Sequence, residues 1–251
     1  MVFYKNSDLG FFFCTIDNYM GFHYSSHSRV KRKRGMKMKV LVTGFEPFGG
    51  EAVNPAYLAV SMLPEWIAGA QIIKKEIPTA FYQSREKLCD LIKEIQPDMV
   101  LCIGQAGGRA GITIEKVGIN LAEAGIPDNN GNQPVDEPID HKGETAYFSN
   151  LPLKAMVQEI RNCGIPASIS YTAGTYVCNY LLYCLLFEIA MNYPQMRGGF
   201  IHVPYATQQG IGKASNTPTM EVSTIATAIE GAIRAAVETV EDISLNAGIT
   251  H

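Results

Sequence analysis

The stretch SYTAGTYVCNYLLYCLLFEIAM, residues 170–191, links the end of an apolar strand to a strongly apolar helix through a glycine. We predict the strand over residues 167–174 and the helix around Tyr180. Glu188 interrupts the apolar run, which falls short of the roughly 18 residues that cross a membrane, so the helix is expected in a protein core. A buried strand, a tight turn and a buried helix form the repeating unit of α/β proteins.

The same alternation runs through the rest of the chain. Further buried strands are expected at residues 39–45, 70–78, 98–104, 112–121 and 198–205, and helices at residues 54–63, 82–96, 151–164 and 219–242. Asn54 is the expected N-cap of the first helix, because Pro55 suits the first helical position. Residues 125–139 are rich in Pro, Asn, Asp and Gly and predict a long surface excursion. The pattern predicts one three-layer α/β/α sandwich with a mainly parallel, twisted sheet.

The first 37 residues differ in composition from everything that follows. They hold seven of the 21 basic residues but only two of the 24 acidic ones, and their aromatic residues follow no period. We interpret residues 1–37 as an atypical N-terminal extension, disordered or not native, and residues 38–251 as a single globular domain of the size of an enzyme. The run KRKR at residues 31–34 is either a solvated charge cluster or a nuclear-localisation or polyanion-binding patch. The remaining body is acidic, which argues against nucleic-acid binding.

Six cysteines, at positions 14, 89, 102, 163, 178 and 184, are scattered without the spacing of a metal site or a disulfide framework. This usage is typical of a reduced cytoplasmic protein with buried free thiols and no bound metal. Four of them lie in predicted helices, a strand or a helix end with apolar neighbours and are expected to be structural: Cys89, Cys102, Cys163 and Cys184. Cys178 needs a separate argument.

Cys178 follows Gly174 by four residues, at the first turn of the predicted helix. The helix N-terminus should lower the pKa of the thiol, and its free N–H groups could hold an oxyanion. The alternative is that Cys178 is a small buried apolar residue, which is the usual role of a free cysteine.

A nucleophilic cysteine needs a base, and His202 stands near the end of the strand at residues 198–205. It could instead be a hydrogen-bonded core histidine. Glu115 lies within an apolar strand, where a buried carboxylate needs a partner such as His202 or a basic side chain. A water-facing Glu115 on an edge strand is the other reading, and Glu188 is a weaker candidate because it lies three turns along the Cys178 helix.

Ligands of such sheets bind at the carboxyl ends of the strands, so residues 44–50, 104–108, 174–178 and those after His202 should converge. Phe45 and Phe48 could form an apolar wall for a small flat ring or belong to the core. The loop of Gln105 could present polar groups to a ligand or be only a tight turn that carries Arg109.

The motifs KVLVTGFEPFGGEAVNP, GQAGGRAGITIEKVGIN, IPDNNG, AGTYVCNYLLY and GFIHVPY closely resemble those of the pyroglutamyl peptidase type I family, the pyrrolidone-carboxylate peptidases, over about residues 38–240. By motif, the resemblance assigns the catalytic triad to Glu115, Cys178 and His202. It implies a phosphorylase/hydrolase-like fold and removal of an N-terminal pyroglutamyl residue from peptides through an acyl-enzyme. It further implies a cytoplasmic homotetramer without metal or cofactor, and a ring pocket at Phe45 and Phe48 with Gln105, Tyr176 and Val177 nearby.

The chain departs from the family pattern at Gly125, where an Arg commonly precedes IPDN, and this leaves substrate positioning open. Two other readings are kept. A nucleoside phosphorylase would use a comparable sheet and a glycine turn for phosphate. A non-catalytic protein that binds pyroglutamyl peptides would keep the fold without turnover.

Overall fold

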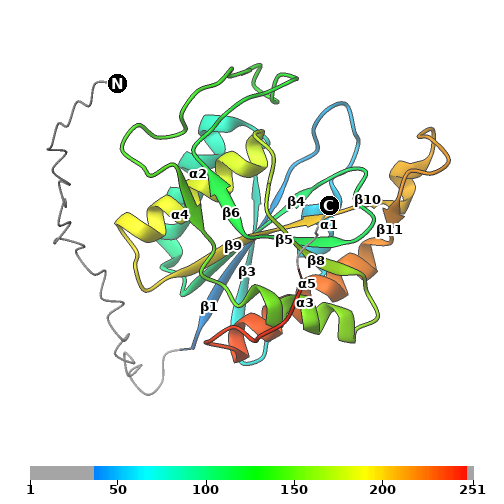
Figure 1. Ribbon diagram of the computed structural model, residues 1–251. Coiled ribbons are helices and arrows are strands. Elements are labelled where there is room, and N and C mark those ends of the chain that lie inside the picture. The colour runs from blue at the N-terminus through cyan, green and yellow to red at the C-terminus, as the bar shows by residue number, and fades with distance from the viewer. Residues whose placement is uncertain (1–36, 248–251) are drawn as a thin grey trace, which may run out of the picture. The chain divides into compact units, whose positions relative to one another are not determined.

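The computed structural model describes residues 37–247, and residues 1–36 of the predicted N-terminal extension lie outside the described range. A seven-stranded sheet has the order β2-β3-β1-β4-β9-β5-β8 (Figure 1). Its strands are β1 (Lys39–Phe45), β2 (Trp66–Ile67), β3 (Ala70–Ile77), β4 (Met99–Gln105), β5 (Ile112–Glu115), β8 (Ala167–Ser170) and β9 (Arg197–Val203). The pairs β1·β3, β1·β4, β4·β9 and β5·β8 are parallel, whereas β2·β3 and β5·β9 are antiparallel. The sheet is therefore mainly parallel, as predicted.

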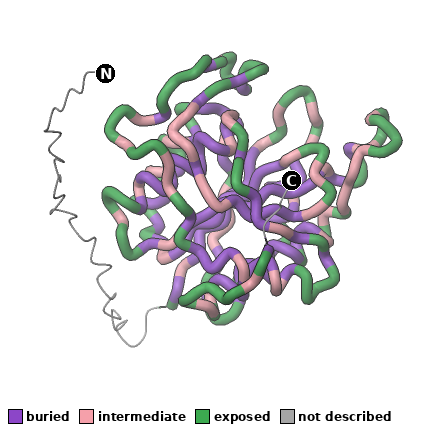
Figure 2. Tube along the Cα trace, in the orientation of Figure 1, coloured by how far each residue is buried: buried purple, intermediate pink, exposed green. Residues whose placement is uncertain are grey.

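Helices cover both faces of the sheet. Helices α1 (Pro55–Met62), α3 (Leu153–Asn162) and α5 (Val222–Glu238) bury their apolar residues in one core cluster. Helices α2 (Phe81–Ile95) and α4 (Val177–Met191) bury theirs in a second cluster on the opposite face. The buried backbone in Figure 2 runs along the sheet between these layers. The three-layer α/β/α prediction is confirmed.

Helix α1 begins where the sequence predicted, because the Asn54 side chain accepts a hydrogen bond from Ala56 N at 3.0 Å and Pro55 takes the first turn. Smaller elements complete the fold: β6 (Val117–Ile119), β7 (Ala146–Phe148), β10 (Tyr205–Ala206), η1 (Thr207–Gly210) and β11 (Thr219–Met220). Within residues 37–247 no helix is long and apolar enough to cross a membrane.

The single strand expected over residues 112–121 is wrong, because the structure divides it at Lys116. The backbone N–H of Lys116 donates to Ser170 O at 2.8 Å, and Lys116 O accepts from Ser149 N at 3.0 Å, so the chain changes partners there. Strand β6 then pairs with β7, outside the main sheet. It packs on α4, where a Cβ on Gly118 would lie 3.0 Å from the backbone of Tyr183.

The strand expected over residues 167–174 is shorter, and β8 ends at Ser170. The Ser170 hydroxyl donates to Thr172 O at 3.0 Å, and Gly174 takes a φ of 77°, so the chain turns before α4 begins. This turn carries residues 171–176 over the end of the sheet and delivers Cys178 to it.

Candidate active site

Three elements bring the proposed triad together on one face of the sheet. Glu115 is the last residue of β5, His202 lies in β9, and Cys178 is the second residue of α4. His202 Nδ1 lies 2.7 Å from Glu115 Oε1, with both side chains almost wholly buried. In the strand register Thr113 faces His202 and Glu115 faces Phe200, so the Glu115 side chain reaches along the sheet to the imidazole.

Gly104 makes room for Cys178 beside His202. It is the register partner of His202 across β4 and β9. A Cβ on Gly104 would lie 3.1 Å from Cys178 Sγ and 2.6 Å from Cζ of Phe200, so both groups occupy space that a side chain would need. The absent side chain lets the thiol sit directly on the sheet, next to the strand that carries His202.

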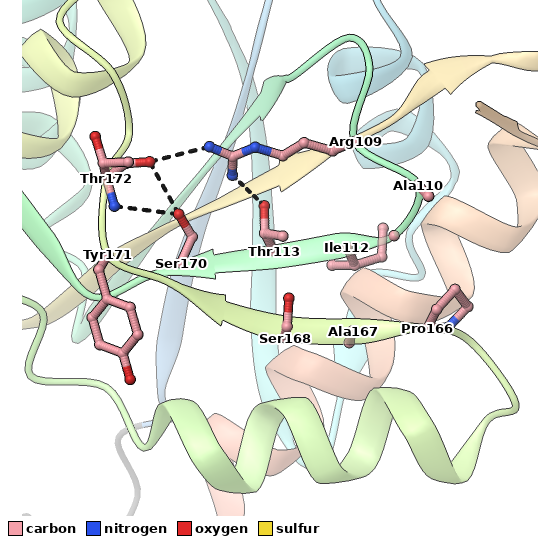
Figure 3. A pocket seen from close by; sticks show the side chains of 11 residues that line it. Arg109, Ala110, Ile112, Thr113, Pro166, Ala167, Ser168, Ser170, Tyr171 and Thr172 are labelled. Atoms are coloured by element: carbon pink, nitrogen blue, oxygen red, sulfur yellow. Dashed lines mark hydrogen bonds between the residues drawn. The ribbon is translucent and has the colours of Figure 1, made fainter. Parts of the chain in front are cut away.

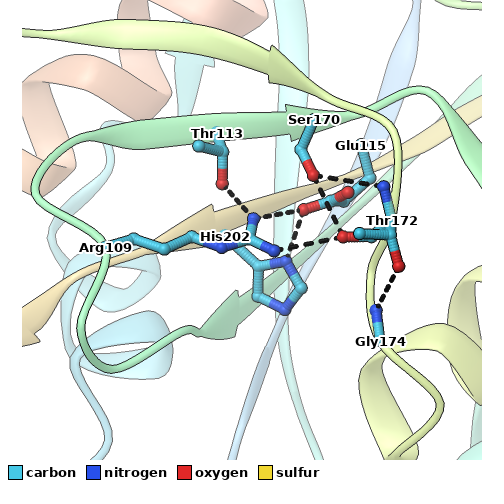
Figure 4. A network of polar contacts seen from close by, with 7 residues as sticks. All are labelled: Arg109, Thr113, Glu115, Ser170, Thr172, Gly174 and His202. Atoms are coloured by element: carbon cyan, nitrogen blue, oxygen red, sulfur yellow. Dashed lines mark hydrogen bonds and ion pairs between the residues drawn. The ribbon is translucent and has the colours of Figure 1, made fainter. Parts of the chain in front are cut away.

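Arg109 is a member of this cluster that the sequence reading left as a turn residue. Its Nη1 lies 2.6 Å from Glu115 Oε1, the same oxygen that His202 contacts, and its Nη2 donates to Thr172 O at 3.1 Å. Figure 4 shows the guanidinium and the imidazole both directed at the Glu115 carboxylate. The sequence held only a general signal, since a buried Glu115 was expected to need a partner such as His202 or a basic side chain.

The charges of this cluster follow from burial and pairing. Burial raises the pKa of Glu115, but hydrogen bonds from His202 and Arg109 outweigh it and hold the pKa below its usual range. Burial lowers the pKa of His202, against the opposing effect of Glu115 and with the help of the Arg109 charge. The resting site therefore holds an ionised Glu115 and a neutral His202.

This ionisation also sets the histidine tautomer. An ionised carboxylate only accepts hydrogen bonds, so Nδ1 of His202 carries the hydrogen and donates it to Glu115. Nε2 of His202 is then the basic nitrogen. The second carboxylate oxygen, Oε2 of Glu115, is buried and makes no hydrogen bond within residues 37–247. The Ser170 hydroxyl, which is level with Glu115 on β8, donates to Thr172 O.

The expectation of a lowered pKa for the Cys178 thiol is wrong in direction. Burial, with the nearby Glu115 carboxylate, raises the pKa of Cys178 to about 12, and the Arg109 charge offsets this only in part. The dipole of one helix terminus is smaller than the cost of placing a thiolate in this apolar setting beside a carboxylate. The resting pair is a neutral thiol and a neutral imidazole.

The first turn of α4 supplies hydrogen-bond donors at Cys178. The first N–H groups of a helix have no intrahelical acceptor, and the N-cap residue Tyr176 makes no side-chain hydrogen bond to them. Asn179, another residue that the sequence reading missed, ties this turn in place. Its side chain accepts from Ile119 N at 3.0 Å and donates to Ile119 O and Leu121 O at 2.9 and 3.0 Å.

The residues expected to bind a ring lie on the other side of Cys178 from Glu115. Phe45 is buried, and its ring centroid lies 6.2 Å from that of Phe200. Phe48 is half-buried, with its ring centroid 6.3 Å from that of Tyr176. Val177 is fully buried at the start of α4. Phe48 and Tyr176 thus remain accessible as a wall, while Phe45 and Val177 belong to the core beneath it.

Gln105 is engaged in holding loops together. Successive side chains of a strand alternate between faces, so Gln105 points to the face opposite Gly104 and the thiol. Its Oε1 accepts from Gln209 Nε2 at 3.0 Å, and the same Gln209 nitrogen lies 3.1 Å from Glu51 Oε2. Sequence segments 44–51, 104–108 and 202–209 therefore meet at the carboxyl ends of the strands, as predicted, and Gln105 links them.

Other candidate residues lie elsewhere. Glu188 accepts a hydrogen bond from Asn192 at 2.7 Å at the far end of α4. Cys102 and Cys184 are buried and Cys89 is half-buried, whereas Cys163 is exposed at the end of α3, so apolar surroundings were wrongly expected for Cys163. Within residues 37–247 no group of three or more His, Cys, Asp or Glu side chains is arranged to hold a metal ion.

Comparison with known proteins gives the family. The sequence model of the family described as pyroglutamyl peptidase matches residues 38–239. This chain belongs to that family of cysteine peptidases. It is 56% identical over 214 residues to the pyrrolidone-carboxylate peptidase of Enterococcus faecalis, which covers 85% of this chain and 100% of that protein. It is 56% identical over 205 residues to the enzyme of the same name from Thermosipho africanus, covering 82% of this chain and 100% of that protein.

Solved structures of the pyroglutamyl peptidase family share the fold. Pyroglutamyl peptidase I from Bacillus amyloliquefaciens superposes with a TM-score of 0.81 at 48% identity, covering 84% of this chain and 100% of that one. Pyrrolidone carboxyl peptidase from Thermococcus litoralis gives a TM-score of 0.80 at 38% identity, with coverage of 84% and 100%. Membership of this family displaces the nucleoside phosphorylase reading.

Proposed function

We propose that this protein removes an N-terminal pyroglutamyl residue from peptides, with Cys178 as nucleophile, His202 as general base and acid, and Glu115 as the group that orients His202. The observation that carries the proposal is the buried Glu115–His202 pair, 2.7 Å apart on β5 and β9, with the Cys178 thiol over the neighbouring strand β4. Family membership supports the substrate class, since the relatives are named for this activity.

The reaction begins from the neutral pair. His202 Nε2 takes the thiol proton as the Cys178 sulfur attacks the pyroglutamyl carbonyl carbon, and Glu115 stabilises the imidazolium that forms. Proton transfer accompanies attack, because burial disfavours a standing thiolate. The negative charge that develops on the carbonyl oxygen is held by N–H groups at the start of α4.

The imidazolium then protonates the leaving amine, the C–N bond breaks, and a thioester to Cys178 remains. Water, deprotonated by His202, attacks the thioester and releases pyroglutamate with the thiol restored. The pyroglutamyl ring is a flat lactam without an ammonium group, so the accessible wall of Phe48 and Tyr176 suits it without a carboxylate to bind a charged amine.

Hydrolysis of a pyroglutamyl anilide tests the proposal. Cys178→Ser and His202→Ala should each abolish turnover while circular dichroism shows a folded protein. Cys163→Ser, at an exposed cysteine, is the matched control and should keep wild-type activity. Absence of turnover in the wild type would favour a non-catalytic protein that binds pyroglutamyl peptides, and turnover in Cys178→Ser would refute the assignment.

The family resemblance also leads us to propose a homotetramer in the cytoplasm that binds neither nucleic acid nor membranes. Sedimentation of the purified full chain tests the assembly, and a monomer would contradict it.

Gly125, where the family commonly carries Arg, lies in a part of the loop where a Cβ would meet nothing within 4 Å. The loop therefore has room for a larger side chain at this position.

A further inference from the structure

A cavity of about 670 Å³ lies beside the proposed triad, over β5 and β8. Figure 3 shows its lining: the Arg109 guanidinium and Thr113 at one end, Ala110 and Pro166 at the other, and Ser168 on its floor. The cavity adjoins the cluster around Glu115, because Arg109 and Thr113 belong both to its wall and to that cluster.

The cavity exists because the two faces of β5 and β8 are covered differently. Ile112, Ile114 and Ile169 point to the face that packs under α3 and α5, and they belong to that core cluster. The alternate residues Thr113 and Ser168, paired in register, point to the face that carries Glu115 and His202. On that face the floor is formed by small hydroxyl side chains, and the pocket stands open above them.

The strand order places the cavity on the same face of the sheet as the proposed reacting groups. Across β1, β4, β9, β5 and β8, the same face presents Phe45, the Cys178 thiol over Gly104, His202, Glu115 and then the cavity. The ring wall lies on the β1 side of the thiol, so the leaving part of a substrate extends toward the β8 side. His202, which must protonate the leaving amine, stands between the thiol and the cavity.

We infer that this cavity binds the peptide that follows the pyroglutamyl residue, and that it selects an apolar side chain there. The inference rests on the proposed function and adds a subsite to it. Neighbouring strands lie ~4.8 Å apart, so the cavity centre is ~12 Å from the thiol, which is the reach of about three extended residues. The third residue after the scissile bond is therefore the one that enters.

The lining favours an apolar side chain over an acidic one. Ala110, Pro166 and the 58% exposed Tyr171 supply apolar surface. The one guanidinium in the wall, that of Arg109, is already paired with Glu115 and with Thr172 O. A leucine or phenylalanine side chain would bury apolar surface here and displace water from it.

The test compares two amidated peptides, pGlu-Ala-Ala-Leu and pGlu-Ala-Ala-Gly, by the kcat/KM for release of pyroglutamate, with the anilide as a reference that has no third residue. We expect the leucine peptide to be cleaved about tenfold better than the glycine peptide, as burial of a leucine side chain predicts. Ser168→Phe, which fills the floor, should bring the ratio near one. Ser223→Phe, at an exposed position of α5, should leave the ratio unchanged.

If Ser168→Phe does not fold, Tyr171→Ala provides a second variant at an exposed position. It should lower the ratio of kcat/KM for the leucine peptide to that for the glycine peptide. Equal rates for both peptides in an enzyme that hydrolyses the anilide would overturn the subsite while leaving the proposed function standing. An equal slowing of all three substrates by Ser168→Phe would also overturn it, because the cavity would then support only the triad. No turnover of any substrate by the wild type would instead refute the proposed function.

Discussion

Replacing Gly104 with alanine should damage catalysis more than its single methyl group suggests. The new Cβ would lie 2.6 and 2.9 Å from Cζ and Cε1 of Phe200 and 3.1 Å from Cys178 Sγ. Carbon atoms prefer separations of about 3.5–4.0 Å, so the Phe200 ring must retreat by about 1 Å. Gly104 itself cannot move away easily, because β4 is paired with both β1 and β9 at this level.

The retreat of Phe200 is transmitted to the triad. Its ring centroid lies 4.8 Å from that of His202 and 6.2 Å from that of Phe45, so the ring is packed against both. Overpacking of a tight core costs about 1–3 kcal/mol of unfolding free energy. Displacement of a reacting group by about 1 Å costs on the order of 10²-fold in rate. We expect Gly104→Ala to lose about 2 kcal/mol of stability and about 100-fold in kcat/KM.

The assay is hydrolysis of the pyroglutamyl anilide together with urea unfolding of the same preparation. Gly125→Ala is the matched control, because its Cβ meets nothing within 4 Å and its backbone needs no left-handed conformation. It should behave as wild type in both measurements. Wild-type kcat/KM in Gly104→Ala would refute the claim that the thiol and Phe200 depend on the missing side chain.

Three further predictions concern the charges of the site. Arg109→Met should lower kcat/KM about tenfold and shift the acidic limb of the pH profile of kcat/KM to higher pH, since loss of the positive charge raises the pKa of His202. Arg109→Lys should restore much of the rate and of the limb position, and an unmoved limb in Arg109→Met would contradict the effect of Arg109 on His202. In the wild type, kcat/KM should stay at its plateau as the pH falls to values below the usual pKa range of histidine, because the lowered pKa keeps His202 neutral there. A fall in kcat/KM that begins above pH 7 would contradict this prediction. Alkylation of Cys178 by iodoacetamide should keep accelerating up to pH 10, as a thiol pKa of about 12 requires; a plateau near pH 6 would indicate a standing thiolate.

The sequence predicted the α/β layers because each signal it used is local. The alternation of buried strands with helices, the Asn54 cap and the Pro55 start depend on residues that are close in the chain, and the structure confirms them. It failed at residues 112–121, where periodicity alone indicated one strand. Lys116 changes hydrogen-bond partners there with Ser170 and Ser149, and such partners are invisible until the chain is folded.

In the proposed site, too, local signals could be read from the sequence, whereas contacts made on folding could not. Cys178, His202 and Glu115 could be chosen from residue type and from their places in predicted elements, and the structure brings Glu115 and His202 into contact. The role of Arg109 could not be assigned, because it depends on β5 lying antiparallel to β9, which returns the loop after β4 to the level of the carboxylate.

By itself the sequence determined which residues have the chemistry of a thiol peptidase and which segments form the strands and helices that carry them. Only the tertiary structure decided their ionisation, since the pKa values of Cys178 and His202 follow from burial and from charges that arrive from other strands. Only the order of the strands across the sheet placed a cavity beside the strand that carries His202, over β5 and β8. Burial and strand order arise from contacts between residues distant in the chain, which no local pattern encodes.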